Sequence, residues 1–155
     1  MQLNISTDYA IRVLLCLGEE GNRVTGGEIS NEMAIPERYL LKVLNKLRNG
    51  GLIQSFSGNA GGYELSKSLS RITLWDVLVT MEETMEINPC LQDEGNCSRH
   101  ATATCPVRRF YCSFQLTIEQ ILRSVSLKSI QNQKSEYAHP SPMHEIYAFA
   151  VGDSG

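Results

Sequence analysis

The feature that most constrains the fold is the stretch 34–65, where a turn, a basic amphipathic helix and a glycine-rich hairpin follow one another. The turn is the tripeptide AIP, whose proline, Pro36, suits the start of a helix. Apolar residues recur at helical spacing over 37–49, and two glycines then end the pattern. Residues 52–56 and 63–65 predict strands, joined by the tip SGNAGG, which tolerates positive φ. This order predicts a winged helix–turn–helix.

Two more helices are predicted before this stretch. Ser6 is the expected cap of the first, and Asp8 lies in its first turn, where the helix dipole favours an acid. Cys16, in the apolar run of this helix, is predicted to be a small core residue. Thr25 and Glu28 have the spacing of a capping box for the second helix.

Further helices are predicted in the C-terminal half. Thr73 and Asp76 resemble another capped start, and Ser126 is the predicted cap of a last short turn. Between them, residues 106–124 form a long helix whose apolar stripe exceeds what one small domain can cover, so a second copy is the natural cover. The stripe consists of Val107, Phe110, Phe114, Ile118, Ile121, Leu122 and Val125.

The expected fold is therefore mainly α with a small β-hairpin: a winged helix–turn–helix plus a long C-terminal dimerisation helix. Residues 1–72 are assigned to the DNA-binding domain, and residues 73–130 to a cysteine loop with the dimerisation helix. Residues 131–155 contain prolines and little periodicity, and are expected to form a flexible extension.

The net charge of −3 does not argue against DNA binding, because the basic residues are concentrated locally. Residues 34–72 carry six basic side chains against two acidic ones, which could face phosphates. The six are Arg38, Lys42, Lys46, Arg48, Lys67 and Arg71.

The predicted third helix also has a polar face. Arg38, Lys42, Asn45 and Asn49 stand at i, i+4, i+7 and i+11, and such long donors suit phosphate oxygens and base edges in a major groove. A merely solvated face is the alternative, as is a winged helix used for protein contacts. The complete motif order favours DNA binding.

Other classes of protein have little support. The chain shows no Ser/His/Asp set, phosphate loop or GxGxxG, and its three histidines, His100, His139 and His144, lie in predicted loops or the tail, so no enzyme is expected. The start lacks a basic segment, and no apolar run approaches the ~20 residues of a membrane span. We expect a cytoplasmic protein without membrane contact.

Four of the five cysteines are clustered as Cys90-x6-Cys97-x7-Cys105-x6-Cys112. In a cytosolic chain, such clustering indicates metal or redox chemistry, since thiolates bind soft metals and iron–sulfur clusters. Structural zinc usually uses C-x2-4-C pairs, which are missing here. The competing chemistry is a cluster-free thiol switch, in which Cys97 or Cys105 forms a disulfide on oxidation.

The stretch IPERYLLKVLNKLRNGGLIQSFSGNAGGYELSK resembles the IscR/NsrR/CymR family of bacterial winged-helix regulators, as does the opening STDYAIRVL. The similarity covers about residues 1–130 and implies a homodimer, crossed over through the long helix, on palindromic double-stranded DNA. Ser57 stands where some members carry an arginine for the minor groove. With Asn45 from the helix face, the expected DNA contacts are Thr25, Pro36, Arg38, Tyr39, Leu41 and Lys42, and in the wing Ser57, Gly58, Asn59, Gly61 and Gly62.

The resemblance further implies that Cys90, Cys97 and Cys105 hold an iron–sulfur cluster, with 4Fe–4S favoured over 2Fe–2S. IscR-type proteins take a histidine three residues after the last cysteine as fourth ligand, and Arg108 occupies that position here. NsrR-type proteins take an aspartate from the partner's first helix, which matches Asp8 of the partner subunit.

Cys112 and His100 are secondary ligand candidates, and Cys112, flanked by Phe110 and Phe114, is expected to be packed away instead. The expected function is a DNA-binding transcriptional regulator, with a repressor favoured over an activator. Its affinity for DNA is expected to respond to nitric oxide, redox state or iron through the cluster. A cluster-free regulator with a thiol switch or a protein or metabolite signal is the alternative. Because Asp8 lies in the DNA-binding domain, this domain would itself be part of the sensor.

Overall fold

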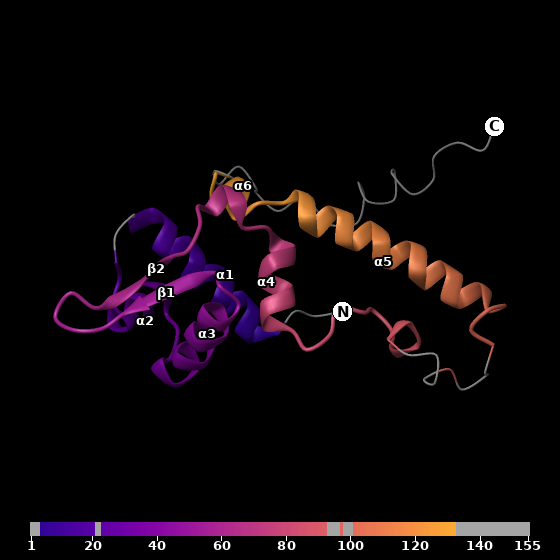
Figure 1. Cartoon of the computed structure of the whole chain (residues 1–155), viewed down its shortest axis with the longest axis horizontal. Helices are drawn as coiled ribbons and strands as arrows, with labels where there is room; N and C mark the ends of the chain where they lie inside the picture. The colour runs from indigo at the N-terminus through magenta and orange to yellow at the C-terminus, as the bar shows by residue number, and fades with distance from the viewer. Residues whose placement is uncertain (1–3, 21–22, 93–96, 98–100, 133–155) are drawn as a thin grey trace.

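The computed structural model describes residues 4–20, 23–92, 97 and 101–132. The predicted ligand His100 and the extension from residue 133 onward lie outside the described residues. The described part is mainly helical with one two-stranded antiparallel sheet, which confirms the predicted fold class (Figure 1). Its elements are α1 (Ile5–Glu20), α2 (Gly26–Met33), α3 (Glu37–Asn49), β1 (Ile53–Phe56), β2 (Gly62–Leu65), η1 (Leu69–Arg71), α4 (Leu74–Met81), η2 (Pro89–Leu91), α5 (Pro106–Ser124) and α6 (Leu127–Gln131).

Helix α1 begins before its predicted cap. The side-chain oxygen of Asn4 accepts the backbone N–H of Ser6 at 3.0 Å, so Asn4 caps the helix and the prediction of Ser6 was wrong. Asp8 does lie in the first turn. Cys16 is fully buried, as predicted for a core residue.

Helices α2 and α3 form the predicted helix–turn–helix. The capping box of Thr25 and Glu28 is present at the start of α2, and Ala34 adopts the left-handed conformation that ends it, with φ of 51°. Helix α3 has the predicted bounds and buries its apolar face. The buried side chains are Leu40, Val43, Leu44 and Leu47.

Strands β1 and β2 form the wing. Phe56 pairs with Gly62 at the tip end, and Tyr63 also exchanges two backbone hydrogen bonds with Val24, which ties the wing to the start of α2. Gly58 has φ of +93°, which favours glycine. A Cβ on Gly61 would lie 2.8 Å from two backbone oxygens, so the tip needs glycine there for space.

The core of the winged helix extends beyond residue 72. Val77 and Met81 of α4 and Leu127 of α6 belong to the same buried cluster as the apolar faces of α1 and α3. The backbone N–H of Leu127 donates to the carbonyl of Ile72 at 2.8 Å, so the chain returns to the domain after α5. The domain division at residue 72 stays a prediction, although this core crosses it.

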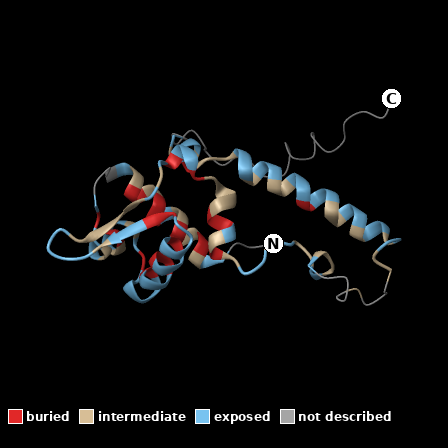
Figure 2. Ribbon diagram, in the orientation of Figure 1, coloured by how far each residue is buried: buried red, intermediate tan, exposed pale blue. Residues whose placement is uncertain are grey.

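Helix α5 projects away from this core and is exposed along most of its length (Figure 2). Gln115 is the one buried residue of this helix, all of which the structure describes. The large apolar side chains exposed on it are Val107, Phe110, Phe114, Leu116 and Ile121. Within the described ranges, no helix combines the length and the apolar character that crossing a membrane requires.

The wing provides a test of this packing. We expect Gly61→Ala to lower the free energy of unfolding by about 1–3 kcal/mol, because the new Cβ meets backbone oxygens that cannot swing away. Gly27→Ala is the matched control: its Cβ meets nothing within 4 Å, and stability should stay equal or rise by up to ~1 kcal/mol. Urea unfolding followed by circular dichroism measures both, and equal midpoints would contradict the expectation.

Candidate nucleic-acid interface and thiol centre

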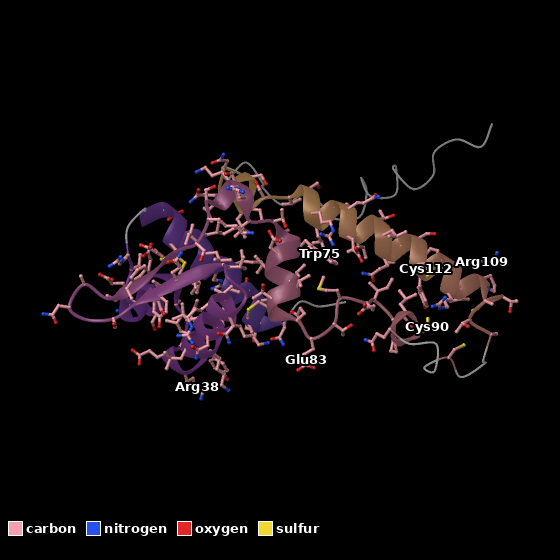
Figure 3. The ribbon with its side chains drawn as sticks, viewed as in Figure 1. Arg38, Trp75, Glu83, Cys90, Arg109 and Cys112 are labelled. Atoms are coloured by element: carbon pink, nitrogen blue, oxygen red, sulfur yellow. The ribbon has the colours of Figure 1, made fainter. Side chains whose placement is uncertain are left out.

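The outer face of α3 carries the predicted DNA contacts. Arg38, Lys42 and Asn45 are all exposed, and their spacing places them on one face, opposite the buried leucines. Leu41 is 60% exposed, which is unusual for leucine and leaves an apolar group beside these donors. Figure 3 shows Arg38 pointing outward from the domain. Helix α3 thus offers donors and an apolar contact on a surface suited to a major groove.

Aromatic rings support the N-terminal end of this face. The guanidinium of Arg38 lies 4.7 Å from the ring centroid of Tyr39, and the rings of Tyr39 and Tyr9 are 6.3 Å apart. Tyr39 therefore contacts both Arg38 on this face and Tyr9 on α1. Pro36, also predicted to touch DNA, is exposed directly before them.

Thr25 is exposed, but its hydrogen-bonding groups are already used. Its hydroxyl and its backbone N–H both donate to the carboxylate of Glu28, at 2.7 and 2.8 Å. The hydrogen bonds from the Thr25 backbone and side chain lower the pKa of Glu28, because they stabilise its ionised form. A phosphate at Thr25 would have to compete with this carboxylate.

The wing tip presents Ser57, Gly58 and Asn59 to solvent, whereas Gly61 and Gly62 are half-buried at its base.

Sequence reasoning missed the residue that supports the tip. Arg23 stacks 3.5 Å above the ring centroid of Phe56, pairs with Glu64 at 3.3 Å and donates to the carbonyl of Ala60 at 3.4 Å. Ala60 and Glu64 lie 37 and 41 residues away in the chain, so no local pattern could reveal this role.

Two of the six clustered basic residues have partners within the domain. Lys46 donates to the backbone oxygen of Met81 at 2.8 Å, which fastens α3 to the last turn of α4. The Nζ of Lys67 lies 3.5 Å from a carboxylate oxygen of Asp76, which forms the capping box of α4 together with the N-cap residue Thr73. Burial raises the pKa of Asp76, but hydrogen bonds from Thr73 and the charge of Lys67 outweigh this and lower it overall. The basic surface open to DNA is therefore smaller than the sequence indicated.

The last turn of α4 is also joined to α1. The hydroxyl of Thr7, fully buried, donates to the carboxylate of Glu82 directly after α4. Thr7 precedes the predicted ligand Asp8, whose own carboxylate pairs with Arg12 at 2.7 Å. Both members of the Asp8–Arg12 pair are nearly half exposed, so this ion pair is weak enough to exchange for another partner.

The cysteine-bearing segments lie at the far end of α5, distant from Arg38 (Figure 3). Cys90 lies in η2, where its backbone N–H donates to the side chain of Asn88 at 3.1 Å. Arg108 of α5 donates to the carbonyl of Cys90, also at 3.1 Å. Arg108, which stands where IscR-type proteins carry a ligand, thus holds the backbone of a cysteine instead.

Cys105 is the N-cap residue of α5 and is set by a tight turn, because its N–H donates to the carbonyl of Ala101 at 2.9 Å. Cys97, Cys105 and Cys112 are all half-buried. The packing predicted for Cys112 was wrong for a single chain: Phe110 and Phe114 stack on each other and are 62% and 45% exposed, so they do not bury the thiol.

The chemistry of the donor set fits a thiolate-bound centre, since soft thiols occupy both segments that meet at the start of α5. Across the ranges that the structure describes, however, no three potential ligands converge in one chain. The ligand set of Cys90, Cys97, Cys105 and Asp8 of the partner subunit therefore stays a prediction.

The helix–turn–helix, the exposed polar face of α3 and the glycine-dependent wing define a winged helix–turn–helix transcriptional regulator. The sequence profile of the Rrf2 family, described as iron-dependent transcriptional regulators, matches residues 3–133. The chain belongs to the Rrf2 family, which confirms the resemblance seen in its sequence.

Individual relatives agree with this assignment. The chain is 32% identical to the HTH-type transcriptional regulator IscR of Escherichia coli O9:H4 over 155 residues, covering 94% of each chain. It is 31% identical to the HTH-type transcriptional regulator NsrR of Geobacillus kaustophilus, covering 79% of this chain and 82% of that one. In structure, CymR, the global cysteine regulator of B. subtilis, matches with a TM-score of 0.70 at 21% identity, covering 86% of this chain and 98% of that one. IscR of T. potens matches with a TM-score of 0.67 at 18% identity, covering 96% of each chain.

Proposed function

We propose that this Rrf2 regulator binds a palindromic operator as a homodimer, and that an iron–sulfur cluster held by its cysteines controls its affinity for DNA. The observation that carries the proposal is the separation of two surfaces on one chain. The exposed face of α3 with Arg38, Lys42 and Asn45 lies at one end of the described structure. The segments bearing Cys90 and Cys105 meet at the other end. The relatives named IscR and NsrR support regulation of this kind.

On DNA, Arg38 and Lys42 lie near the N-terminus of α3, the part of a recognition helix that enters the major groove. Asn45, one turn further, can contact a base edge or a phosphate. The methyl groups of Leu41 can pack against thymine. The wing tip at residues 57–59 would follow the phosphate backbone of the DNA. The contacts of Arg23 with the ring of Phe56 and the carbonyl of Ala60 would hold the tip in place.

The dimer is supported by an uncovered apolar face of α5. Val107, Phe110, Phe114 and Ile121 are between 45% and 62% exposed and lie on one side of the helix. A contiguous apolar face of this kind is costly in water and marks an interaction surface. A second copy meeting it along α5 would place two α3 helices on two half-sites, as a palindromic operator requires.

A charge in this stripe tests the dimer. We expect Phe110→Glu to convert the protein to a monomer at micromolar concentration, because two buried carboxylates would face each other across the interface. Gln120→Glu is the matched control, since it adds the same charge at an exposed position of α5 outside the stripe, and association should stay unchanged. Sedimentation equilibrium measures both variants, and a Phe110→Glu protein that stays dimeric would contradict an interface along α5.

For the cluster, Cys90, Cys97 and Cys105 would supply three thiolates, and Asp8 of the partner subunit would supply an oxygen ligand. When bound, such a cluster provides iron that can react with nitric oxide or oxygen, or be lost when iron is scarce. Within this chain, Arg12 holds the carboxylate of Asp8, so ligation would exchange one ion pair for another partner. The side chain of Asn88 accepts the backbone N–H of Cys90, and Arg108 donates to the backbone carbonyl of Cys90.

Anaerobic purification followed by iron and sulfide assays tests the cluster. We expect a coloured protein with about four irons and four sulfides per chain, because a 4Fe–4S cluster is the favoured type. Cys90→Ser should lose the colour, whereas Cys112→Ser should keep it. A colourless wild-type protein with stoichiometric zinc would overturn the proposal.

A thiol switch is the second candidate. Cys90, Cys105 and Cys112 are only partly buried, so oxidants can reach them without unfolding of the chain. Mass spectrometry of the peroxide-treated, metal-free protein separates this candidate from the first, because a switch would produce a disulfide involving Cys97 or Cys105.

The DNA-binding surface is tested by removing its charge. The double variant Arg38→Ala/Lys42→Ala should lose the specific gel shift and flatten the slope of log K against log salt by about two units, since each phosphate contact contributes about 0.9. The control Arg71→Ala/Lys128→Ala removes the same charge from η1 and α6, on the other side of the domain (Figure 1), and should keep both. Equal behaviour of the two double variants would contradict this interface.

A further inference from the structure

Gln115 is an exception on α5. It is 8% exposed on a helix whose apolar side chains are largely exposed, and the structure describes no other buried residue there. Burying an amide costs free energy unless its hydrogen bonds are satisfied. A buried glutamine on an otherwise open helix therefore needs specific partners.

Those partners are backbone groups of the segment that precedes Cys90. The side-chain oxygen of Gln115 accepts the N–H of Ile87 at 3.0 Å, and its nitrogen donates to the carbonyl of Met85 at 3.0 Å. The same nitrogen donates to Glu119 at 3.2 Å. The amide thus satisfies one donor and one acceptor of a segment without regular secondary structure, as a neighbouring strand would.

Arg108, also on α5, makes a further contact with the same segment, at Cys90. It lies seven residues before Gln115, two turns along α5, and so faces the same side of the helix. Its Nε donates to the carbonyl of Cys90 at 3.1 Å. Together the two side chains hold three backbone groups between residues 85 and 90.

We propose that Gln115 and Arg108 form a backbone clamp that positions Cys90 near the start of α5, where Cys105 occupies the N-cap position. Both are positioning residues, since they act through the backbone that carries the thiol. The inference deepens the proposed function by naming what prepares its cysteine site. The clamp is formed by this chain's own side chains and backbone, so part of the site is built before any ligand arrives.

Glutamine suits this place because it is both donor and acceptor. Leucine has a similar volume but would leave Met85 and Ile87 without partners. Glutamate could still accept from Ile87, but its carboxylate would face the carbonyl of Met85. Gln115→Leu and Gln115→Glu therefore remove the clamp in two different ways.

The experiment compares Gln115→Leu with Gln120→Leu, a matched change at an exposed position of the same helix. In the anaerobic, iron-loaded protein, we expect a chelator to remove iron about 10–100-fold faster from Gln115→Leu, because support around metal ligands typically contributes this much. In the metal-free protein, we expect iodoacetamide to label Cys90 several-fold faster, with labelling of Cys105 unchanged. Mass spectrometry of the two peptides measures this.

Arg108→Met keeps the experiment decisive if Gln115→Leu does not fold. It removes the donor to Cys90 from a half-buried position, and should show the same selective labelling of Cys90. Arg108→Lys, which retains a donor, should restore slow labelling in part.

Two results would overturn the clamp: labelling of Cys90 at the Gln120→Leu rate in both clamp variants, or equal acceleration at Cys90 and Cys105, which would indicate general loosening. If the wild-type protein holds no cluster, the proposed cluster function fails, while the labelling of the metal-free protein still decides on the clamp.

Discussion

The burial of α1 is the interaction on which the rest of the structure depends. Val13 and Leu14 are fully buried and Leu17 almost so, and burying each such side chain contributes about 1.5–3 kcal/mol. Helices α2, α3, α4 and α6 and strand β2 all contact this one helix. Because protein interiors are close-packed, these elements cannot move independently of it. The orientation of α3 and the point at which α5 leaves the domain are thus both fixed relative to α1.

Much of this architecture was predictable because its signals are local. The capping boxes of α2 and α4, the prolines at the starts of α3 and α5 and the glycines after α3 mark boundaries within a few residues, so the bounds of α3 and α5 matched the prediction. The predicted cap of α1 was wrong because two neighbouring residues carry the same local signal. Asn4 and Ser6 are both good caps, and the sequence offers no way to choose between them until the helix is built.

The residues that join the elements could not be predicted, because their partners are distant in the chain. Arg23, Lys46 and Gln115 look like ordinary surface residues, yet they support the wing, fasten α3 to α4 and hold the segment before Cys90. The error at Cys112 arose from adjacency in sequence: at helical spacing, Phe110 and Phe114 point to a different side of α5 from the thiol. The metal ligands stay a prediction, since they would meet across two chains.

The hydrogen bonds at the end of α4 bear on which parts of the sequence can change independently in evolution. The backbone oxygen of Met81 accepts a hydrogen bond from Lys46 of α3, and the carboxylate of Glu82 accepts one from Thr7 of α1. The segment that leads to Cys90 begins directly after these two residues. The described residues beyond it are attached to the core through this junction, through the packing of α5 on α4, where the guanidinium of Arg123 lies 4.1 Å from the ring centroid of Trp75, and through the return of α6. The segments that carry Cys90 and Cys105 can therefore change in sequence without changing the core against which α3 is packed. The protein is modular at this junction, although its sequence shows no linker there.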